Sequence, residues 1–275
     1  MEKIKQALER ARSEQGVNPR AKRNNSNRHQ KSSLEKIEYN QTRVYSPDAA
    51  QLKKHQVVIG SPEFEEAETS FKILRTQVEQ RLAGKGWNAL AVSSPSAGDG
   101  KTTIAINLAI ALAQEMHRTV LLVDLDFRNP NVHIRFDCEI HRGLVDYLLE
   151  DVPISDILVN PGIDRLVLLP AGAPTSSNTS ELLSSPKMIS LVDELKTRYP
   201  ARIIIFDLPP LLSSDDALAF SPFVDTTLLV VSEGHTTKNE LQRVVEYMGN
   251  NDILGTVLNR ATEAQKTYYK KPALS

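Results

Sequence analysis

The stretch SSPSAGDGKTT, residues 93–103, decides how the rest of this sequence is interpreted. Its end fits the pattern G-x-x-x-x-G-K-[ST] of phosphate-binding loops, because Gly100, Lys101 and Thr102 occupy the last three places. Pro95 stands where that pattern has its first glycine. An apolar run precedes the stretch and a helical pattern follows it, which is the strand–loop–helix setting that such a loop requires.

In that setting the loop can hold the phosphates of a nucleotide. Backbone N–H groups of the turn and of the following helix N-terminus would face phosphate oxygens, and Gly98 and Gly100 would permit their close approach. Lys101 would reach the β- and γ-phosphates, while Thr102 would ligate Mg²⁺. A purely structural turn is the alternative. The predicted nucleotide-binding residues of the loop are Ala97, Gly98, Asp99, Gly100, Lys101, Thr102 and Thr103.

Beyond the loop, short apolar runs alternate with helical patterns. The runs are rich in leucine and β-branched residues, as in the strands of a covered parallel sheet, and they span residues 88–94, 119–126, 165–172, 202–210, 226–233 and 253–260. The helical patterns span residues 61–84, 102–116, 143–150, 185–199 and 238–249. We predict an α/β fold of the P-loop NTPase type, with a doubly wound, mostly parallel sheet flanked by helices.

Three carboxylates lie at the ends of predicted strands. Asp124 and Asp126 end one run, and Asp207 ends the most apolar run of the chain. Ligands bind at the carboxyl edge of such sheets, and two acids two residues apart on a strand point the same way. A single acid there can also merely cap a turn. Together with Lys101, the three acids predict an Mg²⁺ site formed by Thr102, Asp124, Asp126 and Asp207.

Charge divides the chain into unequal parts. Residues 1–60 contain 13 Lys and Arg against 6 Asp and Glu, although the whole chain has a net charge of −1. We expect a flexible basic N-terminal extension at 1–60 with a short amphipathic helix, a nucleotide-binding domain at 61–262, and a flexible tail at 263–275. The amphipathic helix is either a solvated helix or an element that docks a partner. The basic extension could touch an anionic membrane, whereas no nucleic acid is expected because aromatic residues are not interleaved with the basic ones.

Composition indicates a reducing compartment. The one cysteine, Cys138, excludes an internal disulfide framework. No run reaches the roughly 18 apolar residues of a membrane span, and no apolar signal core begins the sequence. We expect a soluble, cytoplasmic protein.

The sequence DLDFR at 124–128 resembles the Walker A′ motif of the bacterial tyrosine autokinases, the BY-kinases, in which D-x-D-x-R follows an apolar strand. Their phosphate loop commonly lacks the first glycine, as SPSAGDGKTT does here. Partition and division-site ATPases are close relatives, but they place a second lysine five residues before the loop lysine, where this chain has Ser96. Ser96 and Arg128 therefore favour the kinase branch.

Longer stretches extend this resemblance over residues 62–261. RTVLLVDLDFRNPNVH, LLPAGAPTSSNTSELLSSPKM, RIIIFDLPPLLSSDDA and ILGTVLNRA resemble the exopolysaccharide-locus kinases of the PEP-CTERM type, whose membrane activator is a separate chain. The resemblance implies a protein-tyrosine autokinase that uses ATP and Mg²⁺ and regulates exopolysaccharide biosynthesis or export. It also implies a membrane chain-length or export protein as activator, recruitment to the inner face of the cytoplasmic membrane, and a homo-oligomer.

The same resemblance assigns roles to residues. It implies that Asn259 contacts the adenine with Arg260 beside it, although both could simply end a strand. The chemistry of phosphoryl transfer assigns Asp207 and Asp126 to Mg²⁺ and its waters, and Asp124 to accepting the tyrosine proton or assisting the metal. Asp126 stays the alternative base. The residues with implied catalytic roles are Lys101, Asp124, Asp126 and Arg128.

The tail differs from the family pattern. The family's tail ends in a tyrosine cluster, whereas this one offers Tyr268 and Tyr269, which are the predicted phosphoacceptors. A terminal, polar tail can enter the active site of a neighbouring subunit. Tyr39 and Tyr45 in the N-terminal extension are the alternative phosphoacceptors.

The helix at 61–84 differs as well. The family's interface helix carries E-x-x-R-x-x-R, and alignment on Arg75 puts Lys72 at the middle position and Thr69 at the first. Glu68 lies one place away from the expected glutamate. This helix therefore does not predict the ring assembly of the family.

Two other functions fit the same fold. A dimerising regulatory ATPase would position other proteins, and an inactive adaptor would bind nucleotide and dock a membrane polysaccharide complex. Ser96 and Arg128 argue against the first function. The combination of Lys101 with three acids argues against the second.

Overall fold

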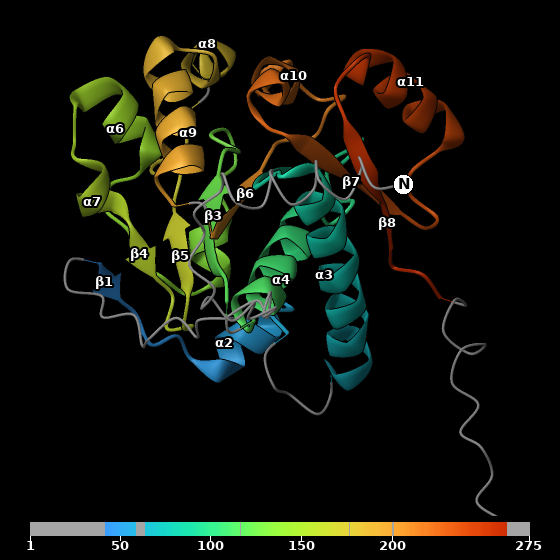
Figure 1. Ribbon diagram of the computed structural model, residues 1–275, viewed down its shortest axis with the longest axis horizontal. Coiled ribbons are helices and arrows are strands. Elements are labelled where there is room, and N and C mark those ends of the chain that lie inside the picture. Colours follow the sequence, from blue (N-terminus) through green and yellow to red (C-terminus); the bar gives the residue numbers. More distant parts are fainter. Residues whose placement is uncertain (1–41, 59–63, 116, 176, 200, 263–275) are drawn as a thin grey trace, which may run out of the picture. The chain divides into compact units, whose positions relative to one another are not determined.

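A computed structural model of the protein describes residues 42–58, 64–115, 117–175, 177–199 and 201–262. The described residues belong to one compact unit. They form a central sheet with helices on both faces (Figure 1). The described parts of the predicted N-terminal extension and domain pack on the same sheet.

The sheet of the described residues has the strand order β1-β4-β5-β3-β6-β2-β7-β8. Neighbouring strands are parallel except β4 and β5, which are antiparallel. This arrangement confirms the predicted doubly wound, mostly parallel sheet. In chain order the strands are β1 (Arg43–Val44), β2 (Ala89–Ser93), β3 (Thr119–Asp124), β4 (Val159–Asn160), β5 (Leu166–Leu169), β6 (Arg202–Asp207), β7 (Thr226–Ser232) and β8 (Ile253–Asn259).

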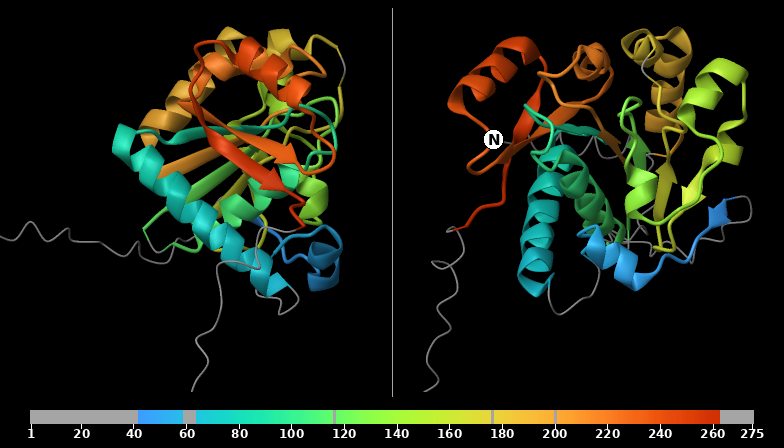
Figure 2. Two further views of the ribbon diagram at one scale, coloured as in Figure 1. Left: turned by 90° about the vertical axis from the view of Figure 1, so that its right-hand side faces the viewer. Right: turned by 180° about the vertical axis from the view of Figure 1, so that it is seen from behind.

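The helices divide between the two faces of the sheet (Figure 2). They are α2 (Ala49–Lys54), α3 (Glu65–Lys85), α4 (Lys101–Ala113), α5 (Val132–Arg135), α6 (Leu144–Glu150), α7 (Ile154–Ile157), α8 (Thr179–Leu183), α9 (Pro186–Arg198), α10 (Asp216–Phe220) and α11 (Lys238–Met248). Alternate residues of each central strand enter two separate cores. One core is shared with α3 and α4, and the other with α6, α8, α9, α10 and α11. Period-2 alternation places successive side chains on opposite faces, so a strand covered by helices on both faces is apolar throughout.

Helix α4 is the central helix of its face. From Ile104 to Ala113 every residue is buried, because strands and α3 surround it. The polar exception is Asn107, whose side chain accepts from the Val58 backbone N–H at 2.6 Å and donates to the Gln56 carbonyl at 2.9 Å. A buried amide is stable only when it is hydrogen-bonded in this way. Asn107 therefore bonds the backbone of residues 56–58 to helix α4.

The structure places residues 42–58 within the domain, on the N-terminal side of the boundary expected at residue 61. Strand β1 pairs with β4, and Val57 and Val58 are buried. Val57 joins the core that contains α4, and Tyr45 and Leu52 of the same segment pack against that core. The described part of the predicted extension therefore supplies an edge strand, β1, and a segment that packs on the core.

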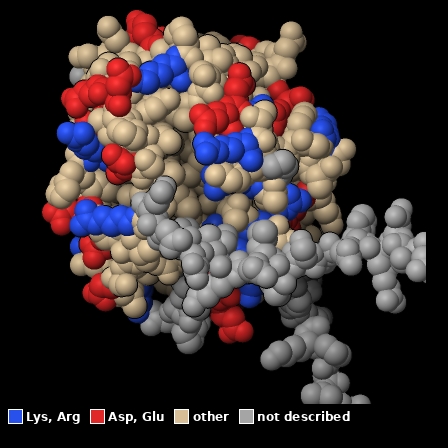
Figure 3. Space-filling view, turned by 60° about the vertical axis from the view of Figure 1, so that its left-hand side comes forward, with Lys and Arg blue, Asp and Glu red and all other residues tan. Residues whose placement is uncertain are grey.

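Acidic and basic side chains are interspersed over the coloured part of the face in Figure 3. Of the helices in the described ranges, not one has the length and apolar content needed to cross a bilayer.

Candidate active site

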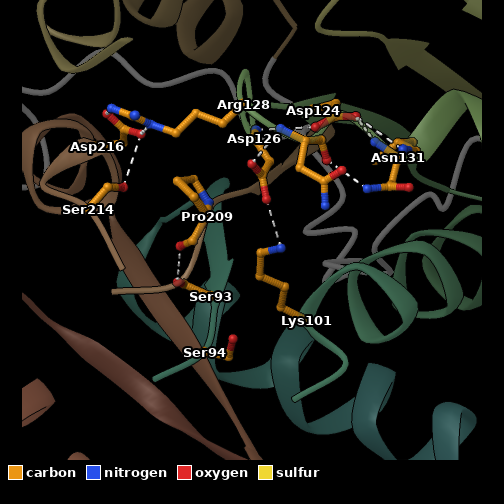
Figure 4. Close-up of polar contacts among 12 residues, drawn as sticks. Ser93, Ser94, Lys101, Asp124, Asp126, Arg128, Asn131, Pro209, Ser214 and Asp216 are labelled. Atoms are coloured by element: carbon orange, nitrogen blue, oxygen red, sulfur yellow. Dashed lines mark hydrogen bonds and ion pairs between the residues drawn. The ribbon is translucent and has the colours of Figure 1, made fainter. Parts of the chain in front are cut away.

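The predicted site residues converge where three neighbouring strands end. The phosphate loop follows β2, Asp124 ends β3, and Asp207 ends β6, which lies between β2 and β3. Asp124 and Asp207 are register partners across the β3–β6 pair. Figure 4 shows Lys101, Asp124 and Asp126 on facing elements at this edge. The carboxyl edge of the sheet is therefore the candidate active site.

The phosphate loop has the backbone that its glycines predict. Gly98 and Gly100 have φ values of +86° and +98°, in the left-handed region that favours glycine. A Cβ at position 100 would lie 2.1 Å from the side-chain nitrogen of Asn259. Gly100 is also the N-cap of α4, which begins at Lys101. The N–H groups in the first turn of that helix have no partner within the helix and are therefore available to a phosphate at the loop.

Lys101 pairs with the acid of the loop after β3. Its Nζ lies 2.9 Å from Oδ2 of Asp126, and both side chains are largely buried. Burial alone would lower the pKa of Lys101, but the carboxylates of Asp207 and Asp126 outweigh it and raise that pKa. The ammonium group is therefore charged, and it is bonded to Asp126.

Asp124 holds the backbone of the following loop. Its Oδ1 accepts from the Asp126 N–H at 3.2 Å, and its Oδ2 accepts from the N–H groups of Asn131 and Val132, each at 3.0 Å. Burial raises the pKa of Asp124 to about 8, and the charge of Asp207 adds to this rise. Burial likewise raises the pKa of Asp207 to about 6, although Lys101 opposes it. Two buried carboxylates at one edge need a cation or a proton.

The residues present fit Mg²⁺. Oδ1 of Asp207 is buried and has no hydrogen-bond partner among the described residues, while Thr102 donates its hydroxyl to the same carboxylate. In the described part of the chain, no group of three or more His, Cys, Asp or Glu side chains forms a complete metal cage. Mg²⁺ typically takes one or two carboxylates together with substrate phosphates. Asp207, Asp124 and Thr102 would supply such a partial ligand set, whereas the fourth predicted ligand, Asp126, is paired with Lys101.

Arg128 lies apart from the other predicted catalytic residues. Its Nε donates to Oδ2 of Asp216 at 2.8 Å, and Asp216 also accepts from the hydroxyls of Thr179 and Ser214 at 2.7 and 3.0 Å. In Figure 4 the Arg128 side chain points toward Asp216 and away from Lys101. The structure therefore joins Arg128 to α10 rather than to the acids, and its catalytic role stays a prediction.

The remaining predicted nucleotide-binding residues lie around the loop. Asn259 donates its side-chain N–H to the Asp99 carbonyl at 2.8 Å, whereas the side chain of Arg260 is exposed beside it. Ala97 lies exposed on the loop, and the hydroxyl of Thr103 accepts from Arg135 at 3.1 Å. Contacts of Asn259 and Arg260 with a base stay predictions.

Of the predicted phosphoacceptors, only Tyr45 lies in the described residues. Tyr39, Tyr268 and Tyr269 lie outside them. The hydroxyl of Tyr45 donates to the Glu139 carbonyl, and the guanidinium of Arg43 lies 4.8 Å from its ring. Tyr45 is thus engaged by its own domain.

The predicted interface positions of α3 also make contacts within the chain. Arg75 pairs with Glu115 at 2.8 Å and donates to the Ala111 carbonyl, and Lys72 pairs with Glu68 at 2.7 Å. The shifted glutamate therefore serves as the helix partner of Lys72.

Sequence reasoning missed three residues that contact the site. Asp216 binds Arg128, and both His235 and Thr236, in the loop after β7, contact Asp99 of the phosphate loop. For His235 and Thr236, the one signal in the sequence was their place after a predicted strand, because the loop after β7 lies at the same sheet edge as the phosphate loop.

Comparison with known proteins agrees with this geometry. Residues 88–250 match the family model described as an AAA domain. The tyrosine-protein kinase YwqD of Bacillus subtilis (strain 168) is 30% identical over 212 residues, which cover 76% of this chain and 87% of that protein. The chain belongs to the bacterial tyrosine-protein kinase family. The succinoglycan biosynthesis transport protein ExoP of Rhizobium meliloti is 31% identical over 209 residues, which cover 74% of this chain and 26% of ExoP.

Solved structures place this kinase closer to its own family than to the related ATPases. The VpsO kinase domain superposes with a TM-score of 0.64 at 30% identity, covering 73% of this chain and 98% of that one. The septum site-determining protein MinD from Pyrococcus horikoshii, a complex with Mg-ADP, has a TM-score of 0.53 at 26% identity, covering 64% and 71% of the two chains. A P-loop domain of this type binds nucleotide.

Proposed function

We propose that this kinase transfers the γ-phosphoryl group of ATP to tyrosines of its own chain and thereby regulates exopolysaccharide biosynthesis or export. The observation that carries the proposal is the pairing of Lys101 with Asp126 beside Asp124 and Asp207. The polysaccharide link is supported by the relative ExoP, which is named for succinoglycan biosynthesis and transport.

The chain's own residues divide the chemistry among them. Backbone N–H groups of the loop and of α4 bind the phosphates, and Lys101 exchanges Asp126 for the β- and γ-oxygens. Thr102, Asp207 and Asp124 would hold Mg²⁺. The metal ion, when bound, neutralises charge on the transferred phosphoryl group.

Of the two candidate bases, Asp126 is the one we assign. Both oxygens of Asp124 accept backbone N–H groups, which leaves it a positioning role and a role beside the metal. Asp126 binds Lys101 through Oδ2, and this oxygen becomes available when the lysine turns to the phosphates. Because the tyrosine hydroxyl has a pKa near 10, it needs a carboxylate placed beside it in line with the phosphorus atom.

The tyrosines of the tail are the proposed phosphoacceptors. Tyr268 and Tyr269 stand among Lys266, Lys270 and Lys271, whose charges favour approach to an acidic site. Delivery to a neighbouring subunit is proposed, which makes the active form a homo-oligomer. A membrane protein of chain-length control or export would act as its activator at the inner face of the cytoplasmic membrane.

One observation bears on the regulatory ATPase as a second candidate. That class has a lysine where this chain has Ser96, and the Ser96 hydroxyl donates to Glu240 at 2.7 Å. A hydroxyl at this position cannot supply the positive charge of a lysine. The ATPase alternative is therefore disfavoured.

Phosphosite mapping tests the proposal. After incubation with ATP and Mg²⁺, mass spectrometry should find phosphate on Tyr268 or Tyr269, and the double change Y268F/Y269F should remove most of it. Tyr45→Phe is the control, because the Tyr45 hydroxyl is already hydrogen-bonded. Phosphate confined to Tyr39 or Tyr45 would rule out the tail as substrate.

A further inference from the structure

The loop between β7 and α11 is bonded to the phosphate loop through the side chain of Asp99. We propose that His235 is a positioning residue, which fixes the phosphate loop in its nucleotide-binding form by bonding Asp99. This inference rests on the proposed nucleotide site. His235 lies outside the phosphate loop and outside the DLDFR sequence at 124–128.

The carboxylate of Asp99 lies between the phosphate loop and the loop after β7. It is fully buried, and its Oδ2 accepts from the Ser96 N–H at 2.9 Å across the turn of the loop. Its Oδ1 is 2.7 Å from Nδ1 of His235 and accepts from the Thr236 hydroxyl at 2.9 Å. Because a carboxylate accepts hydrogen bonds, the contact assigns the proton to Nδ1 of His235.

These contacts hold the part of the loop whose residues have the greatest backbone freedom. Gly98 and Gly100 flank Asp99 and both have left-handed backbones. Glycine has more conformational freedom to lose than any other residue, so a loop with two glycines needs side-chain contacts to keep one shape. Asp99 is the residue between them, and its buried carboxylate bonds the Ser96 N–H within the loop and two side chains outside it.

Two further contacts tie the same elements together. The Ser96 hydroxyl donates to Oε1 of Glu240, and Oε2 of Glu240 accepts from the Thr237 N–H at the start of α11. On the other side of the loop, Asn259 at the end of β8 donates to the Asp99 carbonyl. Asp99 is therefore hydrogen-bonded from two elements. The loop after β7 contacts its side chain, and the end of β8 contacts its backbone carbonyl.

His235 is the member of this set that can be tested most cleanly. Its side chain is 47% exposed, so truncation to alanine opens no buried cavity. It lies outside the groups assigned to phosphate, metal or tyrosine. Its loss should therefore weaken nucleotide binding and raise KM for ATP while leaving kcat at saturating ATP close to that of the wild type.

The test is titration of the full chain with fluorescent N-methylanthraniloyl-ADP and Mg²⁺. His235→Ala should weaken binding about tenfold, equivalent to about 1.4 kcal/mol. His235→Asn should restore most of the affinity, because the asparagine side-chain N–H can donate to Asp99 from the place of Nδ1. His141→Ala is the matched control, since His141 is exposed in the segment before α6, and it should bind like the wild type.

The outcomes separate the two proposals. If the wild type itself binds no nucleotide, the proposed function fails. If the wild type binds and His235→Ala binds equally well, the positioning role is wrong, and it is also wrong if His235→Asn is as weak as His235→Ala. If His235→Ala does not fold, Ser96→Ala removes only the hydroxyl that bonds Glu240, and unchanged affinity in that variant would contradict the coupling of the two loops.

Discussion

The ammonium group of Lys101, the first residue of α4, lies 2.9 Å from the carboxylate of Asp126, which lies in the loop after β3. The pair holds the lysine at the sheet edge with its charge balanced. In the proposed mechanism, phosphate oxygens compete with this carboxylate for the ammonium group, so nucleotide binding would release Asp126 to act as the base.

Removal of the loop cation should abolish phosphorylation. Lys101→Met keeps the length of the side chain but loses the charge that stabilises the phosphoryl group, so we expect autophosphorylation to fall at least about a hundredfold. Lys85→Met is the control, because Lys85 lies at the end of α3 over the Trp87 ring. Tyrosine phosphorylation at the wild-type rate in Lys101→Met would contradict the assignment of the loop.

The acids should separate by their effects on rate and on stability. Asp126→Asn and Asp207→Asn should each lower turnover at least about tenfold, or about 1.4 kcal/mol of barrier. Asp124→Asn should also lower the free energy of unfolding, since an amide cannot accept from all three backbone N–H groups. Full activity in folded Asp126→Asn would exclude it as the base. Urea unfolding and initial rates measure the two effects.

Stability without metal should fall as the pH rises. The pKa of Asp124 is raised to about 8 and that of Asp207 to about 6, so each group is more stable protonated in the folded chain. Their contribution to stability is complete below the ordinary carboxyl pKa near 4 and is lost as the pH rises through these folded-state values. Mg²⁺ with ADP should offset the loss increasingly from pH 6 to pH 8.5.

Thermal unfolding with chelator or with Mg²⁺ and ADP, between pH 5.5 and 8.5, measures this effect. Asp124→Asn serves as the comparison, because it cannot titrate and should show a flatter profile. A wild-type profile without metal that rises with pH relative to that of Asp124→Asn would contradict the raised pKa values.

The Asp216 cluster should be structural first. Asp216→Ala removes the acceptor of Arg128, Thr179 and Ser214, and we expect the free energy of unfolding to drop by about 2 kcal/mol. Arg128→Met should cost less stability, because the guanidinium is partly exposed and solvent screens the pair. Asp215→Ala is the control on the adjacent, exposed acid. Equal stability of Asp216→Ala and Asp215→Ala in urea would show that the cluster contributes nothing.

The sequence predicts the parts of the fold whose signal is local. Strands β2, β3, β5, β6, β7 and β8 are apolar runs, and α4 follows a glycine-rich turn, so each was predicted near its observed place. Strands β1 and β4 have two residues each, too few to show a period. The position of 42–58 depends on Val57 and Val58 meeting α4, which is a tertiary contact.

The same distinction applies to the site. Asp124 and Asp207 end β3 and β6, and Lys101 begins the helix that follows β2 and the phosphate loop. Parallel topology brings these positions to one sheet edge, and the sequence alone predicts this. The bond of His235 to Asp99 joins residues 136 positions apart, and the partner of Arg128 lies 88 positions away. No spacing rule indicates such pairs, because they depend on which loops the strand order makes neighbours.

The most direct test of the account is phosphoamino-acid analysis of the full chain after incubation with γ-labelled ATP and Mg²⁺, with Lys101→Met in parallel. The account predicts phosphotyrosine in the wild type and no label in the variant. Hydrolysis of ATP by the wild type without any phosphotyrosine would contradict it and would indicate an ATPase.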